Sequence, residues 1–159
     1  VLVEPEIPNN AGNIGRTCVV TGCHMHLVGP LGFDTDEKAY RRAGLDYWPR
    51  LMLTEHEHLA AYHAAHPPAT TRRWLLSSKA ETSVYDADLQ PGDHLLLGRE
   101  SAGLPASLTE AAPDHCISLP MRARERSLNQ ASCAAVVIYE MLRRAIATGQ
   151  RTPGKDNRF

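Results

Sequence analysis

Three segments of the sequence combine glycine with amide, hydroxyl or charged side chains, and each follows a short apolar run. They read PNNAGNIGR (8–16), LLLGRESAGLP (95–105) and ISLPMRARERSLNQAS (117–132). Glycine lets a backbone turn sharply or approach a ligand closely, and amide side chains both donate and accept hydrogen bonds. In open α/β sheets, ligands bind beyond the carboxyl ends of the strands. Three such segments at one sheet edge would therefore build one polar pocket.

Each segment is ambiguous when it is taken alone. The first has a G-x-x-G spacing that matches neither the dinucleotide fingerprint nor a Walker loop, and a turn with a helix cap would explain it. In the second, Glu100 lies between Gly98 and Gly103, although an isolated loop glutamate is more often solvated. In the third, Ser127 and Gln130 have the spacing of a capping box. Only the combination points to a site.

The rest of the sequence predicts the elements that would position these segments. Apolar runs predict strands at 1–4, 24–30, 72–78, 91–100 and 116–120. Amphipathic stretches and caps predict helices at 13–22, 36–44, 55–68, 105–114 and 129–148, the first of them capped by Asn10 or Asn13. Near-continuous apolar strands that alternate with helices indicate an α/β fold, with a mostly parallel sheet and helices on both faces.

We expect one domain over residues 1–149 and a flexible tail over residues 150–159, because the tail has the composition of a disordered end. The chain starts in mid-strand without a methionine, so we expect residues upstream of Val1.

The predicted helix at 129–148 has two apolar stripes instead of one. They consist of Ala134, Val137, Ile138, Met141 and Ala145, and of Cys133, Val136, Leu142 and Ile146. A helix on the surface of a domain needs one stripe. The second indicates a partner subunit, unless the helix is enclosed by its own domain.

The composition is that of an ordinary soluble domain. The 159 residues are 43% hydrophobic and carry a net charge of −1, with no run long enough to cross a membrane and no signal peptide. The basic residues are 14 arginines and 3 lysines. Arginine suits bidentate phosphate contacts, but a GC-rich genome would also favour it.

The cysteines and histidines show no standard metal-binding spacing. Cys18, Cys23, His24 and His26 are close in sequence, but Cys18 falls on a predicted helix and the two histidines alternate along a predicted strand. We therefore expect no metal, and we expect reduced cysteines in a cytoplasmic protein. Four further histidines are predicted to lie on a solvated helix face: His56, His58, His63 and His66.

Taken together, NNAGNIGR, LGRESAGLP and SLPM…RSLNQASCAAVVIYE resemble, in order and spacing, the three motifs of the SPOUT class of RNA methyltransferases. The resemblance covers almost the whole chain. The segment RRAGLDYW (41–48) is similar to the compact bacterial tRNA methyltransferases that modify the ribose of cytidine or uridine 34. The resemblance implies a C-terminal trefoil knot, S-adenosyl-L-methionine as cofactor, tRNA as substrate and a homodimer formed through the last helix.

The resemblance also implies roles for individual residues. Those that would bind the cofactor are Leu76, Ser77, Gly98, Glu100, Gly103, Leu119, Met121, Ser127 and Leu128. Those that would contact tRNA are Asn10, Arg41, Arg42, Arg122 and Arg124. Arg16 and Asn129 would be catalytic, Arg16 by stabilising negative charge on the attacking 2′-oxygen, either in its own subunit or across the dimer. Glu100 would orient an arginine near the site.

Other interpretations stay open at this point. The same fold could methylate tRNA position 32 or ribosomal RNA, or it could be a non-catalytic RNA-binding dimer that binds no cofactor. Arg16 alone would also suit the surface of a helix, and the arginines at 122 and 124 could be solvated charges.

Overall fold

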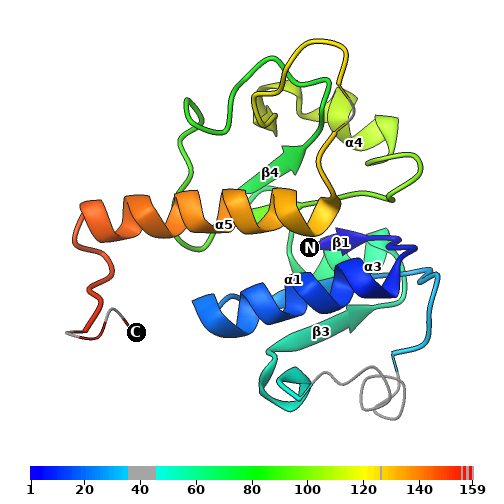
Figure 1. Ribbon diagram of the computed structural model, residues 1–159. Coiled ribbons are helices and arrows are strands. Elements are labelled where there is room, and N and C mark those ends of the chain that lie inside the picture. The colour runs from blue at the N-terminus through cyan, green and yellow to red at the C-terminus, as the bar shows by residue number, and fades with distance from the viewer. Residues whose placement is uncertain (36–45, 126, 155, 157, 159) are drawn as a thin grey trace.

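Six short strands form the centre of the computed structural model, which describes residues 1–35, 46–125, 127–154, 156 and 158 (Figure 1). In chain order they are β1 (Leu2–Val3), β2 (Met25–Val28), β3 (Leu53–His56), β4 (Arg73–Leu76), β5 (His94–Leu96) and β6 (Cys116–Ile117). They pair in parallel in the orders β1-β2-β3 and β5-β4-β6.

The two three-stranded groups join through β1 and the residue that follows β5. The amide of Val3 donates to the carbonyl of Leu97 at 2.8 Å, and the amide of Leu97 donates to the carbonyl of Val1 at 2.9 Å. The strands therefore run side by side in the order β3-β2-β1-β5-β4-β6, and the prediction of a mostly parallel sheet is confirmed.

Helices cover both faces of this sheet, as the sequence predicted. They are α1 (Pro8–Thr21), η1 (Trp48–Arg50), α3 (Leu59–Ala65), α4 (Ala106–Ala111), η2 (Pro113–His115) and α5 (Gln130–Ala147). On one face, Ile14 of α1 and Val137 of α5 pack against Leu27 of β2. On the other, Tyr62 of α3 packs against Val28 of β2. Neighbouring residues of a strand face opposite sides, so one strand contributes to both cores.

The first helix begins at Pro8, not at residue 13, so the first glycine-bearing segment is helical instead of a loop. Proline suits the first helical position because its missing N–H would have no partner there. The predicted caps Asn10 and Asn13 lie inside the helix, and no side chain caps its start. At Gly15 a Cβ would lie 3.0 Å from the ring of Trp48, so close packing explains this glycine.

The predicted helix at 55–68 is in fact the end of β3 followed by α3. His58 is exposed and accepts a hydrogen bond from the amide of Ala61 at the start of α3. The prediction of a solvated face is wrong for His56 and His66, whose rings lie within 6 Å of the ring of His26, measured between centroids. The reason is that His56 belongs to β3 itself, whereas α3 packs onto β2 and brings His66 against the sheet.

The last helix agrees closely with its prediction, because α5 runs over Gln130–Ala147 and Gly149 follows it with φ +73°. Of its second stripe, Val136 and Ile146 remain 38% and 37% exposed, so this stripe is not enclosed by its own domain. None of the described helices is long and apolar enough to span a membrane. The predicted helix at 36–44 lies outside the described residues, and the boundary at 149 and the flexibility of the tail stay predictions.

Candidate active site

A cavity of about 870 Å³ lies beyond the carboxyl ends of β4, β5 and β6. All nine residues predicted to bind the cofactor line it, and so do Asn10 and Asn129. They come from four parts of the chain: the start of α1, the end of β4, the segment after β5, and the segment between β6 and α5. The predicted convergence of the three segments is therefore confirmed, whereas the role of each residue stays a prediction.

One chain of hydrogen bonds joins the three segments. The carboxylate of Glu100 accepts from the amide of Glu6 at 2.8 Å and from the side-chain nitrogen of Asn10 at 3.0 Å. The side-chain oxygen of Asn10 accepts from Nδ2 of Asn129 at 2.9 Å, and Oδ1 of Asn129 accepts from the amide of Ala131 at 2.9 Å. Each amide side chain thus has one orientation that satisfies both neighbours. Glu100 thus binds the start of the first segment, through Glu6 and Asn10, and its predicted role in orienting an arginine, in its own subunit or across the dimer, stays a prediction.

The cap of α5 is Asn129, not Ser127 as the capping-box spacing predicted. Asparagine and serine are about equally good caps, so local propensity does not choose between them. Asn129 is additionally held by Asn10, while Ser127 is exposed. Gln130 does not close a capping box, because its Nε2 donates to the carbonyl of Gly98. Its Oε1 is buried and has no hydrogen-bond partner among the residues that the structure describes.

The segment after β5 folds back on itself. The amide of Arg99 donates to the carbonyl of Gly103 at 3.0 Å, and the amide of Gly103 donates back to the carbonyl of Arg99 at 2.8 Å. A Cβ at Gly98 would lie 2.1 Å from the carbonyl carbon of Gly103, so no larger residue fits. Gly103 has φ +76°, in the left-handed region that glycine adopts without strain. Two of the predicted glycines are therefore required by the backbone itself.

Glu6 is a site residue that the sequence analysis missed. Its carboxylate accepts from the hydroxyl and from the amide of Ser101, both at 2.9 Å, and from Nε of Arg99 at 3.3 Å. The hydrogen bonds from Ser101, helped by the charge of Arg99, lower the pKa of Glu6. Glu6 follows the end of β1, so the rule that draws attention to polar residues after a strand would have found it.

Arg16 lies on α1 and does not line the cavity. Its guanidinium lies 4.2 Å from the ring centre of Tyr47 and 3.8 Å from the carboxylate of Asp46, and its side chain is 57% exposed. Tyr47 is fixed in turn by a hydrogen bond to the carbonyl of Gly12. The described part of the segment RRAGLDYW thus positions Arg16 at the surface, where it is accessible from outside the chain.

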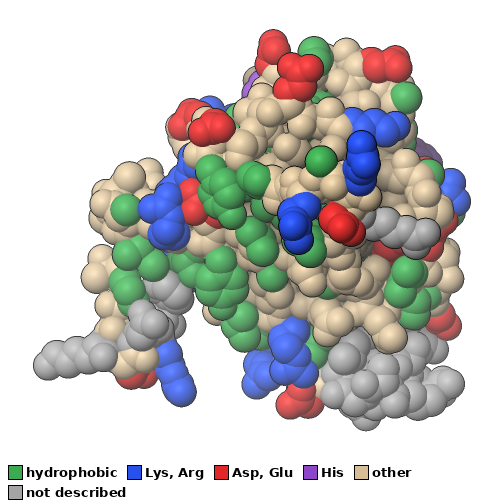
Figure 2. Space-filling view, turned by 45° about the horizontal axis from the view of Figure 1, so that its top comes forward, with side chains coloured by type: hydrophobic (Ala, Val, Ile, Leu, Met, Phe, Trp, Pro, Cys, Tyr) green, Lys and Arg blue, Asp and Glu red, His purple; other side chains and the backbone are tan. Residues whose placement is uncertain are grey.

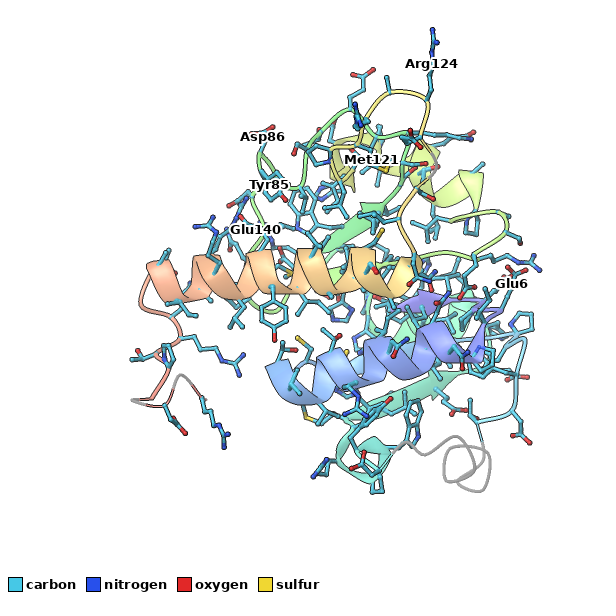
Figure 3. All side chains as sticks on the ribbon, in the orientation of Figure 1. Glu6, Tyr85, Asp86, Met121, Arg124 and Glu140 are labelled. Atoms are coloured by element: carbon cyan, nitrogen blue, oxygen red, sulfur yellow. The ribbon has the colours of Figure 1, made fainter. Side chains whose placement is uncertain are left out.

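The arginines predicted to contact tRNA lie at the edge of the described site or beyond it. Arg122 and Arg124 are exposed and do not line the cavity. In Figure 3, Arg124 points outward from the tip of its segment, whereas Met121 lies nearer the body of the molecule. Arg41 and Arg42 lie outside the described residues.

The lining fits a ligand that is partly flat and apolar and partly polar. Leu76, Leu119, Met121 and Leu128 offer apolar surface, and the backbone after β4, β5 and β6 offers donors and acceptors. Gln130 also lines the cavity, and its buried Oε1 has no hydrogen-bond partner among the described residues. An adenosine-containing cofactor has this combination of properties.

Comparisons with known proteins agree with this geometry. The profile of the SpoU rRNA Methylase family matches residues 1–139. The tRNA (cytidine(34)-2′-O)-methyltransferase of Burkholderia pseudomallei is 42% identical over 146 residues, which are 91% of this chain and 94% of that protein. The protein of the same name from Escherichia coli is 42% identical over 144 residues, 90% of each chain.

Two solved structures have the same fold. One, described as "Structural insights into the 2-OH methylation of C/U34 on tRNA", is 42% identical, has a TM-score of 0.83, and matches 93% of this chain and 94% of its own. The other is the SpoU methyltransferase AviRb from Streptomyces viridochromogenes in complex with AdoMet, which is 27% identical, has a TM-score of 0.72, and matches 92% of this chain and 59% of its own. Since the family profile spans most of the sequence and the relatives match nearly end to end, this chain belongs to the SpoU methylase family of RNA methyltransferases.

Proposed function

We propose that this chain transfers the methyl group of S-adenosyl-L-methionine to the ribose 2′-oxygen of nucleotide 34, the wobble nucleotide of tRNA. The observation that carries the proposal is the chain of hydrogen bonds from Glu6 through Glu100 and Asn10 to Asn129, which joins the three motif segments around one cavity. Relatives with 42% identity over nearly the full length are named for this reaction and support the choice of substrate.

The cofactor-binding part of the proposal assigns a task to each part of the cavity. S-adenosyl-L-methionine, when bound, supplies an electrophilic methyl group on its sulfonium. The side chains of Leu119, Met121 and Leu128 contact its apolar surface, and the backbone around Ser77 and Gly98 meets its polar edge. Gln130 holds the Gly98 carbonyl in place.

The catalytic part of the proposal rests on charge and orientation. A 2′-hydroxyl must lose its proton as it attacks, so negative charge develops on its oxygen. A guanidinium is a poor base, but it stabilises such charge well when it is held in place. The guanidinium of Arg16 is held by its contact with the ring of Tyr47. Asn129 holds the ribose. Its side chain is already oriented, since its Nδ2 donates to Asn10 and its Oδ1 accepts from the start of α5.

A homodimer follows from the position of Arg16, which in one chain stands apart from the cavity. We infer that Arg16 of each subunit serves the cavity of the other. Figure 2 shows hydrophobic side chains gathered on the face formed by α1 and α5. Val20, Val136, Tyr139 and Ile146 are the exposed apolar residues of these two helices. A second copy that packs on this face would cover them.

Three finer statements complete the proposal. We infer that the segment between β6 and α5 is threaded into a trefoil knot; the contacts that support this are those of Ser118 with Thr82 and Val84, which tie it to the segment after β4. The exposed Arg122 and Arg124 would contact tRNA phosphates. All four cysteines are free thiols, which suits the reducing cytoplasm.

Methylation of bulk tRNA with labelled S-adenosyl-L-methionine tests the proposal. The expected result is one new 2′-O-methyl group at nucleotide 34, and its loss in Arg16→Ala with the dimer intact. A methyl group at position 32, or on ribosomal RNA alone, would overturn the assignment of the substrate. No heat of cofactor binding by calorimetry, together with no methylation, would instead favour a non-catalytic RNA-binding dimer.

A further inference from the structure

Five of the histidines gather at one place on the α3 side of the sheet, although they are spread over the sequence from residue 24 to residue 94. His24 precedes β2, and His26 is the second residue of β2. His56 ends β3, His66 follows α3, and His94 begins β5. The ring of His26 is central: its centroid lies 4.5 Å from that of His24, 4.8 Å from that of His66 and 5.4 Å from that of His94. We call these five residues the histidine cluster.

Three members of the histidine cluster bring ligand atoms together. One ring nitrogen from each of His26, His56 and His66 lies within 4.8 Å of the other two. The Nδ1 of His26 and the Nε2 of His56 are 3.1 Å apart. Zinc–nitrogen bonds of about 2.1 Å place the ligands of a tetrahedral ion roughly 3.4 Å apart, so one pair already has almost the required spacing. The third nitrogen needs a side-chain movement of about 1 Å or slightly more.

From this geometry we propose that His26, His56 and His66 form a zinc-binding site that nothing in the methyl-transfer chemistry requires. The site is all-nitrogen, which suits Zn²⁺ and other first-row ions of borderline softness and does not suit Mg²⁺ or Ca²⁺. His94 or a water molecule completes the tetrahedron. The Nδ1 of His94 is 2.7 Å from the hydroxyl of Tyr62, which leaves its Nε2 as the ligand atom.

The scaffold of the site is rigid. His26 and His56 lie on neighbouring strands whose register is fixed by the pairing of β2 with β3. The backbone amide of His66 donates to the carbonyl of Tyr62 at 2.9 Å, and Tyr62 is completely buried. Ligands on strands and at the end of a packed helix lose little freedom when a metal binds, so little of the binding free energy is lost in ordering them.

The guanidinium of Arg73, which donates to the carbonyl of His66 and lies 5.1 Å from the ring centre of Tyr62, opposes a nearby cation and limits the affinity.

A bound ion would have a structural role. It would tie together the second residue of β2, the last residue of β3 and the end of α3. The candidate active site lies beyond the carboxyl ends of β4, β5 and β6 instead, and none of the three ligands lines its cavity. Zinc binding can therefore be tested independently of the proposed methyl transfer.

The test uses the purified full chain after treatment with a chelator and then dialysis against Zn²⁺, with Mg²⁺ as a parallel sample. We expect one zinc ion per chain by elemental analysis, a higher midpoint of thermal unfolding with Zn²⁺ and no change with Mg²⁺. Replacement of Zn²⁺ by Co²⁺ should give the visible absorption of a tetrahedral nitrogen-ligated ion.

Two variants locate the ion. His66→Gln should lose the zinc and its thermal shift, and His115→Gln, the same change at an exposed histidine outside the histidine cluster, should keep both. Thermal unfolding in chelator shows whether His66→Gln still folds; if it does not, His56→Gln takes its place. A wild-type chain that binds no zinc, or a His66→Gln chain that binds it as the wild type does, would overturn the proposal.

Discussion

The two ends of the sheet satisfy their polar groups in opposite ways. At the carboxyl ends, Glu100, Asn10 and Asn129 form a chain in which side-chain N–H groups donate to side-chain oxygens. Near the amino ends of β2 and β5, like groups meet: the rings of His24, His26 and His94 lie against one another. A neutral imidazole has one donor and one acceptor nitrogen, and the lone pair of the acceptor nitrogen is the group that can bind a metal ion.

This difference shows how each end relates to ligands. At the carboxyl end, the side chains of Glu100, Asn10 and Asn129 already hydrogen-bond to one another. The cavity therefore has its shape before any ligand binds. The ring nitrogens of the histidine cluster gain a further partner only if a metal ion with vacant coordination sites binds there. The following substitutions test this contrast, beginning with the one expected to have the largest effect.

Gly98→Ala should collapse the carboxyl end. The new Cβ would lie 2.1 Å from the carbonyl carbon of Gly103, and backbone cannot move aside as a side chain can. We expect a loss of about 3 kcal/mol or more in the free energy of unfolding and no measurable cofactor binding. Denaturant melts and calorimetry measure the two. Gly149→Ala is the control, since it has a positive φ but open space, and should cost only about 1 kcal/mol.

Glu140→Gln provides a reference that belongs to neither end. The carboxylate of Glu140 is buried on α5, and its hydrogen bonds with Arg143 and Arg144 lower its pKa to about 2. A lowered pKa means that the stabilisation is complete above the ordinary value of 4.5 and is lost as the pH falls towards 2. We expect a loss of about 2 kcal/mol near pH 7 that shrinks across this acid range.

Unfolding by urea at a series of pH values measures this profile. Glu81→Gln, the same change at an exposed carboxylate, is the control and should show almost no difference from the wild type. A constant difference between Glu140→Gln and the wild type from pH 7 to pH 2 would contradict the prediction.

Asn129→Ala should separate the true cap of α5 from the one that the sequence predicted. The change removes the cap and the bond to Asn10, so we expect a loss of about 1.5 kcal/mol in stability and weaker cofactor binding. Ser127→Ala is the matched control and should stay within about 0.5 kcal/mol of the wild type. Equal losses in thermal melts of the two variants would show that both residues cap the helix.

Tyr62→Phe should have the smallest effect, at the amino end. It removes the hydroxyl next to Nδ1 of His94 and leaves the ring in the core, so we expect a loss of about 1 kcal/mol. Tyr85→Phe, at an exposed tyrosine, should be neutral in the same urea melts. If Zn²⁺ binds at the histidine cluster, the cost of Tyr62→Phe should change with added zinc, whereas the effects at the carboxyl end should not.

The sequence by itself determined the α/β class, the parallel sheet and the last helix, because hydrophobic periodicity and terminal glycines are local signals. It also determined the shared cavity, since polar residues after parallel strands meet at one edge of the sheet. It misjudged the start of α1 and the cap of α5. At α1, Asn10 could serve as a cap or as a link between segments, and its bond to Asn129 across the fold makes it a link. At α5, the same bond helps to hold Asn129, and not Ser127, at the cap position.

The tertiary structure alone decided the fate of the histidines. No spacing rule connects His26, His56 and His66, which come from two strands and the end of a helix. Periodicity reports which face of an element is apolar, but it carries no information about which side chain of a distant element packs against that face. That pairing is set by the order of the strands and by the crossover of α3, so the histidine cluster exists only in the folded chain.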